Sequence, residues 1–320
     1  MDALERDLLL KIADLHGIPE GAYNIRENGK PAGRRSTEHI EIASRKDGKS
    51  GIDIIIKPGT KNESVHIPVI LSETGYNEVV YNDFYVGEDC DVTIIAGCGI
   101  HNCGKATSRH DGVHTFHIGK NSKVRYVERH YGEGDGEGKR VMNPETIAFI
   151  ADGASMDMEM TQSKGVDDTH RVTRATLGEK SELTVREKIY TNGIQEASTD
   201  FCVDMNGADC RADVVSRSVA AEHSKQHFCS TMNGNAACHG HTECDAIIMD
   251  GAVFIGERSE RGTHSRSGNR ENRRRTTCKA DDFGTDGKGS RRTNHQRLFA
   301  LNLCRTRAPE SYGAGADIKL

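Results

Sequence analysis

Apolar and polar residues follow two successive periods along this chain, first that of an amphipathic helix and then that of β-strands. Residues 2–15 carry apolar side chains on one helical face, at Leu4, Leu8, Ile12 and Leu15. Gly17 fits the residue that follows such a helix, because glycine readily adopts the left-handed conformation required there. Residues 23–35 follow neither period and predict a loop. Residues 1–35 are therefore expected to form a helix and a loop in front of a β-rich body.

A period of two governs residues 36–253, where short alternating segments follow turns that contain glycine. The turn glycines include Gly87, Gly119, Gly153, Gly178, Gly207 and Gly234. Such a repeat of short strands predicts a mainly β protein with a parallel β-helix, or solenoid, as its core. In that fold each coil buries its apolar face only against its neighbours. A β-sandwich or jelly roll gives similar spacing and is the alternative.

The alternation stops abruptly near residue 253. Residues 257–297 contain no Ile, Leu, Val or Met, and residues 254–320 hold 15 Lys and Arg against 8 Asp and Glu. Such a segment cannot bury enough apolar surface to offset the entropy of ordering its backbone, so it is expected to be irregular or disordered. Its charge alone would suit nucleic acid, but no nucleic-acid module or interleaved aromatic residues accompany it, so no such partner is expected.

Composition restricts the location and chemistry of the protein. No apolar run approaches the roughly 20 residues of a membrane span, and the charged N-terminus is unlike a signal peptide, so a cytoplasmic protein without a membrane partner is expected. In a reducing compartment the ten cysteines are expected to be thiols or metal ligands rather than disulfides. No glycine-rich phosphate loop is present, which predicts that this chain binds no nucleotide.

Two segments concentrate cysteine and histidine. The first supplies the candidate metal ligands Cys98, His101 and Cys103, and the second contains Cys238, His239, His241 and Cys244. Thiolate and imidazole together favour zinc, copper or iron–sulfur species, although neither spacing is that of a zinc finger. Strand alternation would turn the two histidines of the second segment away from its two cysteines. The alternative is that these cysteines pack inside the solenoid while the histidines face solvent.

Several long segments resemble the SufB/SufD family of iron–sulfur cluster assembly proteins, in its short archaeal or anaerobe-type form. They are IADLHGIPEGAYNIRENG (12–29), IKPGTKNESVHIPVILSETG (56–75), VVYNDFYVGEDCDVTIIAGCGIH (79–101), VVSRSVA (214–220) and GHTECDAIIMD (240–250). The resemblance covers residues 1–253. It implies a right-handed β-helix that pairs with itself as a homodimer or with a SufB/SufD paralogue. It also implies binding to the SufC ATPase and sulfur from a cysteine desulfurase system.

The resemblance further implies a scaffold rather than an enzyme, on which a transient Fe–S cluster forms at the paired interface. Cys244 occupies the position of the family's key assembly cysteine, with Cys238, His239 and His241 as further candidates for cluster binding. Glu243 and Asp245 flank this thiol, and their charge would oppose thiolate formation. Two alternatives remain: a zinc- or iron-binding solenoid, and a β-helix enzyme that acts on polysaccharide. The second is disfavoured by 5% aromatic residues and the absence of Trp.

Family members continue past this point into a His-Glu pair and an amphipathic helical tail that docks the ATPase, and this chain shows neither. Codons chosen for residues 269–281 read, one base later, as IGKIAGEQLVKL, which resembles that tail. A frameshift near residues 250–261 would therefore explain residues 254–320 as a non-native, out-of-frame replacement of the helical domain. This interpretation predicts impaired ATPase docking.

Overall fold

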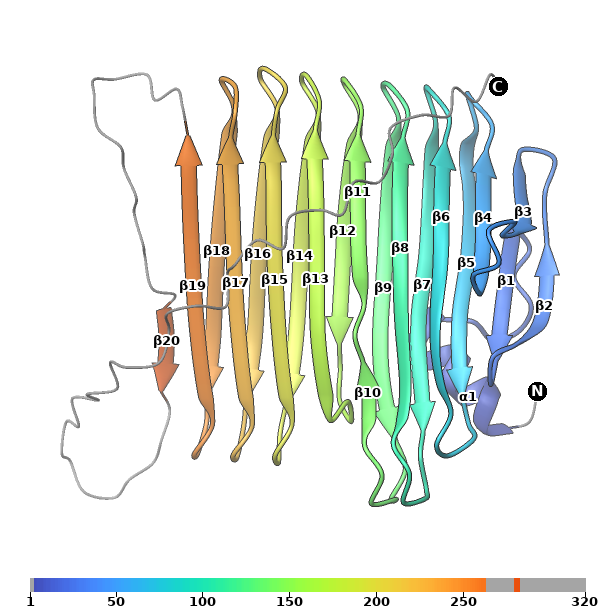
Figure 1. Ribbon diagram of the computed structural model, residues 1–320, viewed down its shortest axis with the longest axis vertical. Helices are drawn as coiled ribbons and strands as arrows, with labels where there is room; N and C mark the ends of the chain where they lie inside the picture. Colours follow the sequence, from blue (N-terminus) through green and yellow to red (C-terminus); the bar gives the residue numbers. More distant parts are fainter. Residues whose placement is uncertain (1–2, 263–278, 283–320) are drawn as a thin grey trace. The chain divides into compact units, whose positions relative to one another are not determined.

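From β4 onward, consecutive strands of the chain alternate between two facing sheets, except that β10 and β11 lie in the same sheet. The computed structural model describes residues 3–262 and 279–282, with side chains through residue 259. One sheet has the order β2-β1-β5-β7-β9-β12-β14-β16-β18-β20, and the other runs β19-β17-β15-β13-β10-β8-β6-β4-β3, with β11 between β8 and β13 (Figure 1). We call these sheet A and sheet B. The alternation produces a β-solenoid of about seven turns, as the glycine-punctuated pattern predicted.

The elements have the following bounds. The helix is α1 (Ala3–Ala13). The strands are β1 (Ala22–Glu27), β2 (Lys30–Arg35), β3 (Ile40–Ser44), β4 (Gly51–Ile56), β5 (Lys61–Leu71), β6 (Asn77–Val86), β7 (Asp91–His101), β8 (Ser108–Ile118), β9 (Lys123–Glu133), β10 (Arg140–Met142), β11 (Glu145–Ile150), β12 (Ser155–Gln162), β13 (Asp168–Leu177), β14 (Glu182–Thr191), β15 (Glu196–Met205), β16 (Arg211–Ala220), β17 (Lys225–Gly234), β18 (His239–Ile248), β19 (Val253–Gly262) and β20 (Lys279–Asp282).

Successive coils stack in parallel and in register. In sheet A, Glu182 pairs with Arg211 and Arg211 with His239, so equivalent residues lie 29 and then 28 positions apart. Antiparallel pairing is confined, among the described residues, to β1 with β2 and β3 with β4 at the N-terminal end. This parallel stacking excludes the β-sandwich alternative, whose sheets are antiparallel.

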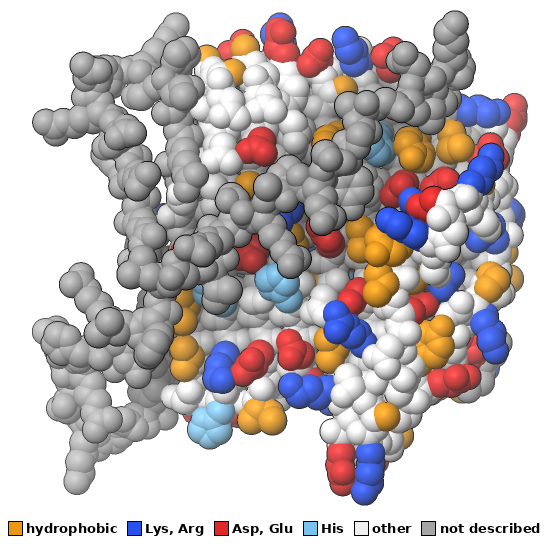
Figure 2. Space-filling model, in the orientation of Figure 1, with side chains coloured by type: hydrophobic (Ala, Val, Ile, Leu, Met, Phe, Trp, Pro, Cys, Tyr) orange, Lys and Arg blue, Asp and Glu red, His pale blue; other side chains and the backbone are white. Residues whose placement is uncertain are grey.

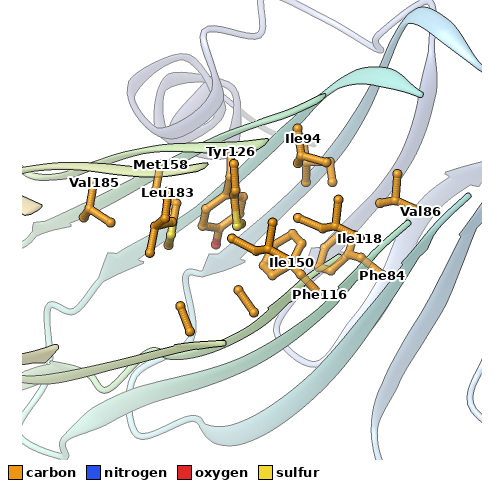
Figure 3. Close-up of a cluster of buried hydrophobic side chains, with 14 of the residues drawn as sticks. Phe84, Val86, Ile94, Phe116, Ile118, Tyr126, Ile150, Met158, Leu183 and Val185 are labelled. Atoms are coloured by element: carbon orange, nitrogen blue, oxygen red, sulfur yellow. The ribbon is translucent and has the colours of Figure 1, made fainter. Parts of the chain in front are cut away.

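The core fills the space between the two sheets. Inward positions recur at every second residue, as in β14, where Leu183, Val185 and Ile189 are buried. Figure 3 shows apolar side chains from both sheets meeting there, including Tyr126 of sheet A and Phe116 of sheet B. Because each coil supplies only a thin layer, the core is continuous only through contacts between neighbouring coils.

Helix α1 covers the outer face of sheet A at its N-terminal end. Leu8 and Ile12 are fully buried against that sheet, as the apolar face of residues 2–15 predicted. The strand beneath has glycine at the contact, because a Cβ on Gly97 would lie 2.6 Å from the carbonyl oxygen of Ile12. The helix is shorter than the predicted residues 2–15, however. Asp14 adopts the left-handed conformation (φ 54°) and ends the helix at Ala13.

The segment predicted as a loop, residues 23–35, folds instead into the β1–β2 hairpin. Asn28 and Gly29 form its two-residue turn, both with positive φ (44° and 74°). An Asn-Gly pair between strands is a strong hairpin signal because both residues tolerate this conformation, so the loop prediction was wrong. Strand β1 also pairs in parallel with β5, which places the hairpin at the edge of sheet A.

Strand β19 continues the solenoid past residue 253, where the apolar alternation ends. It pairs with β17 from Lys225 and Val253 to Gly234 and Gly262, and the short β20 pairs with β18. The rest of the predicted basic tail, residues 263–278 and 283–320, lies outside the described residues. On the face seen in Figure 2, side chains of both charges are interspersed over the strands. Nowhere in the described parts of the chain does a helix have the length and apolar character to cross a membrane.

Candidate functional site

Cys244 lies on the inner face of β18, within the core and 4% exposed. Thr242 and Ala246 share that inner face, whereas Glu243 and Asp245 point to the outer face. Strand alternation therefore places these two carboxylates on the opposite side of the sheet from the thiol.

Cys244 ends a column of inward-facing residues that crosses sheet A. In register with it on successive strands lie Ser216, Glu187, Met160 and Glu128. The Glu187 carboxylate accepts hydrogen bonds from Ser216 Oγ at 2.7 Å and from Thr199 Oγ1 of sheet B at 2.9 Å. We call Glu128, Met160, Glu187, Ser216 and Cys244 the Cys244 column. A polar interior therefore extends to the coil next to the thiol.

The charge on this column is balanced from the facing sheet by Arg171 of β13. Its guanidinium bonds to Glu128, lies 3.5 Å from Glu187 Oε1 through Nε and contacts His130 Nδ1 at 3.2 Å. Burial by itself would raise the pKa of Glu128, but the adjacent Arg171 charge lowers it to about 2. Burial raises the pKa of Glu187, which lies farther from the same cation. Glu128 and Arg171 are thus the ionised pair at the centre of the solenoid.

Neutral groups extend this network toward the N-terminal coils. Tyr126 OH donates to Glu128 Oε1 at 3.0 Å and lies 2.7 Å from His114 Nδ1. Since the single hydroxyl proton is directed to the carboxylate, His114 donates through Nδ1, and its Nε2 accepts from Asn82 at 3.2 Å. Burial lowers the pKa of His114 to about 4, which keeps the imidazole uncharged at neutral pH.

The other candidates in the second Cys/His segment lie apart from Cys244. His239 and His241 are exposed on the outer face, as the alternation predicted. Cys238 precedes β18, about 20 Å along an extended strand from Cys244. It instead adjoins Cys210 on the neighbouring coil, where burial and then the nearby Cys238 raise the pKa of the Cys210 thiol to about 11.

The first Cys/His segment is also divided. Cys98 faces inward and packs with a second apolar cluster that includes Val69 and Met142, and burial raises the pKa of its thiol well above the usual range. His101 and Cys103 meet at the surface, with 2.9 Å between Nε2 and Sγ. Across the part of the chain that the structure describes, no group of three or more His, Cys, Asp or Glu side chains could hold a metal ion.

A shallow groove of about 580 Å³ crosses β12, β14, β16 and β18. Exposed side chains such as Lys188, Arg217 and Asp245 line it, which places it on the outer face of sheet A. Because the Cys244 thiol faces the interior, this groove provides no direct access to it.

The buried residues Glu128, Arg171 and Glu187 were missed in the sequence. The signal that identifies them is their position in the inward–outward alternation of each strand, which we call strand phase. Glu187, for example, falls two residues after Val185 and two before Ile189, at an inward position. A charged residue at such a position must find a partner inside the protein. Arg258 of β19 was also missed. Its guanidinium bonds to the Thr242 carbonyl, next to Cys244 on the inner face.

Comparisons with known proteins agree with this architecture. The model of the SUF system FeS cluster assembly SufBD core domain matches residues 78–253, more than half of the chain. An iron–sulfur cluster assembly SufBD family protein of Methanocaldococcus jannaschii is 25% identical over 209 residues, or 64% of this chain and 65% of that relative. The chain thus matches just under two thirds of the relative's length. The matched solenoid core shows that this chain belongs to the SufBD family of SUF iron–sulfur cluster assembly proteins.

Proposed function

We propose that this chain is a scaffold component of a SUF complex and that Cys244 supplies a thiolate to the nascent Fe–S cluster. The observation that carries the proposal is the position of this thiol on the inner face of β18, at the end of a polar column. Thiolate sulfur both ligates iron and accepts sulfur, so one residue can take part in both steps of cluster assembly. Membership of the SufBD family supports a role in assembly rather than metabolite turnover.

Cys244 lies near the last described coil of the solenoid. Strand β18 pairs with β16 along ten residues, which include the Ser216–Cys244 pair. Beyond β18 in sheet A, the described part of the chain contains the four-residue strand β20. We infer that opening this coil to expose the thiol costs less than opening a central coil, which is packed between neighbouring coils on both sides.

The cluster, as the cargo of the scaffold, requires more ligands than one cysteine. Fe–S clusters are held by about four protein ligands, and no group of three candidate ligands occurs in the described parts of this chain. We therefore infer that a second chain, either another copy or a SufB/SufD paralogue, completes the transient site. Sulfur would come from a cysteine desulfurase system, and a SufC-type ATPase would supply the hydrolysis, while this chain itself is not an enzyme.

Anaerobic reconstitution with ferrous iron and sulfide tests the role of Cys244. The wild-type chain should develop a visible Fe–S chromophore that Cys244→Ala loses, whereas Cys210→Ala should retain it. Cys210 is a matched control because it is also buried and immediately precedes the neighbouring strand β16. Equal far-ultraviolet circular dichroism of the three proteins would exclude unfolding. An undiminished chromophore in Cys244→Ala, or stoichiometric zinc binding without one, would overturn the proposal.

The docking defect concerns residues 254–320 and is proposed from the sequence pattern alone. A pull-down with a SufC-type ATPase should capture a frame-restored version of this chain and recover much less of the present one. Equal recovery would contradict the frameshift interpretation. Sequencing the gene around the codons for residues 250–261 provides an independent check, because the alternative frame must be intact downstream.

A further inference from the structure

Four sulfur-containing side chains gather at one edge of the last coils, where β15 and β17 end and β16 and β18 begin (Figure 1). They are those of Met205, Met232, Cys210 and Cys238. The first three are buried in the main core cluster, and the half-buried Cys238 packs against it. Both sheets therefore contribute sulfur to the same edge of the solenoid interior.

The two thiols are stacked on neighbouring coils of sheet A. Cys210 immediately precedes β16 and Cys238 immediately precedes β18, and these strands pair in parallel from their first residues. A hydrogen bond joins the two side chains, and the backbone N–H groups of Gly207 and Cys210 also face the Cys210 sulfur. Because N–H groups directed at a sulfur atom favour its charged form, they help to stabilise the thiolate that metal binding requires.

The two thioethers meet beside Gly240, two residues after Cys238. A Cβ on Gly240 would lie 2.9 Å from Met232 Sδ and 3.3 Å from Met205 Sδ. Two residues of an extended strand span about 7 Å, so both thioethers lie within reach of the Cys238 side chain. Methionine has three rotatable side-chain bonds, which allow its sulfur to move toward a shared ligand. Gly240 is also exposed, so the thioethers adjoin a position that solvent reaches.

This set of donors selects a soft metal ion. Thiolate and thioether sulfur together favour Cu(I), whereas zinc takes thiolate, imidazole or carboxylate ligands. Across the described residues, no third His, Cys, Asp or Glu side chain joins the two thiols, so this part of the chain cannot complete a zinc site there. His239 directly follows Cys238 but points to the outer face of sheet A.

We propose that these four side chains form a Cu(I) site that is separate from the role proposed for Cys244. The two cysteines supply thiolates, and the two methionines complete the coordination with neutral thioethers. Binding releases two protons, one from each thiol, and changes no oxidation state, so the ion and its two thiolates carry one net negative charge. The ligands come from four consecutive strands, and the bound ion therefore cross-links the last coils.

A competition titration of the metal-free, reduced full chain under anaerobic conditions tests the site. Cu(I) is supplied together with bicinchoninate, a chelator that removes the ion from weaker thiols. The readout is the alkylation rate of Cys238, followed by peptide mass spectrometry. At a free Cu(I) concentration ten times the dissociation constant, this rate should fall about tenfold, because only the unliganded thiol reacts. The rate at the half-buried Cys202 should not change.

Two ligand variants separate the contributions of thiolate and thioether. Cys210→Ser should abolish the protection of Cys238. The double variant Met205→Leu/Met232→Leu, which nearly conserves volume, should weaken Cu(I) binding about tenfold or more, since even loss of a residue that only orients a metal ligand costs about that much. Should Cys210→Ser not fold, Cys238→Ser changes a half-buried position instead and should lose the same affinity in the bicinchoninate competition.

Cys90→Ser and Met156→Leu are the matched controls, and both should bind Cu(I) like the wild type. Cys90 is also fully buried directly before a strand of sheet A, but its neighbour on the next coil is Ser122 rather than a second cysteine. Met156 is an equally buried methionine on β12. Equal far-ultraviolet circular dichroism of all variants establishes that they fold.

Protection of Cys238 that persists in folded Cys210→Ser would overturn the proposal, as would an unchanged Cu(I) affinity in the folded double methionine variant. Zinc that protects Cys238 at a lower concentration than Cu(I) does would overturn it as well. The readout is the occupancy of one thiol pair and does not depend on cluster formation. Its failure is therefore distinct from a failure of the role proposed for Cys244.

Discussion

Replacing Arg171 by methionine tests the conclusion that the centre of the solenoid depends on one buried ion pair. The substitution keeps most of the side-chain length but removes the charge that bonds to Glu128 and lies 3.5 Å from Glu187. Both carboxylates remain fully buried, so neither can regain the lost interaction from water. Truncating one partner of a buried pair typically costs about 3–5 kcal/mol of unfolding free energy.

The lowered pKa of Glu128 gives a similar free energy for the interaction of this carboxylate with its surroundings. Its fall from 4.5 to about 2 corresponds to about 3 kcal/mol of interaction that favours the charged form. Because this folded-state pKa is depressed, the stabilisation is present above pH 4.5 and is lost as the pH falls toward 2. In Arg171→Met, burial alone should raise the pKa of Glu128, so that variant should lose stability as the pH rises instead. The difference in unfolding free energy between wild type and variant should therefore become smaller as the pH falls from 7 to 4.5.

Urea unfolding followed by circular dichroism measures both effects. The matched control is Arg186→Met, because Arg186 forms an exposed pair with Asp157 at 2.7 Å, a class of pair that contributes about 0–1 kcal/mol. The double variant Glu128→Gln/Arg171→Met should recover part of the loss, since the carboxylate that bonds directly to Arg171 is then removed together with the cation, while Glu187 remains. A loss of unfolding free energy in Arg171→Met that is no larger than in Arg186→Met would contradict a stabilising buried ion pair. A difference from wild type that does not change with pH would contradict it as well.

Three further predictions concern the core and the helix. The pKa of His114 in the folded protein is lowered to about 4, so protonation favours the unfolded state and wild type loses stability as the pH falls from 7 to 5. The variant His114→Gln should lose about 2 kcal/mol less unfolding free energy over that range, which urea midpoints at the two pH values measure. Phe84→Ala should cost about 3–5 kcal/mol in urea unfolding, since the ring is fully buried and stacked on Phe116 at 4.4 Å; a loss under 1 kcal/mol would contradict this packing. Gly97→Ala should detach α1, because the new Cβ would lie 2.6 Å from the Ile12 carbonyl oxygen; limited proteolysis should then cleave after the helix, and unchanged resistance would contradict the contact.

The repeated strands could be predicted from the sequence because every coil buries an apolar face against its neighbours in the same way. Alternation identified the inward side of strands such as residues 183–189, and the glycine turns marked the coils. Asn28 and Gly29 were equally readable but were overlooked, since the flanking residues lack a clear apolar period. The end of α1 could not be predicted from a glycine in the same way, because the residue that adopts positive φ there is Asp14.

The site was less predictable than the fold, since its groups belong to strands distant in sequence. Arg171 and Glu128 are 43 residues apart and lie in different sheets, so only the closed coil brings them together. The same geometry divided the candidate set Cys98, His101 and Cys103. Cys98 occupies an inward position, whereas the other two lie at the strand end and beyond it. Counting soft ligands in a segment cannot anticipate this separation, but strand phase can.

Strand phase also fixes what Cys244 can do. In the ten-residue register of β16 with β18, a slip of one residue would turn the thiol to solvent and bring Glu243 or Asp245 into the core. The cost of burying an unpaired carboxylate there excludes the slip. The thiol is therefore held facing inward until the coil itself opens. Opening should cost less in the last described coils, to which β18 belongs, than in a central coil packed between neighbours on both sides. Reactivity at this cysteine should thus depend on contacts that cover or release the last coils, rather than on the charge of its sequence neighbours.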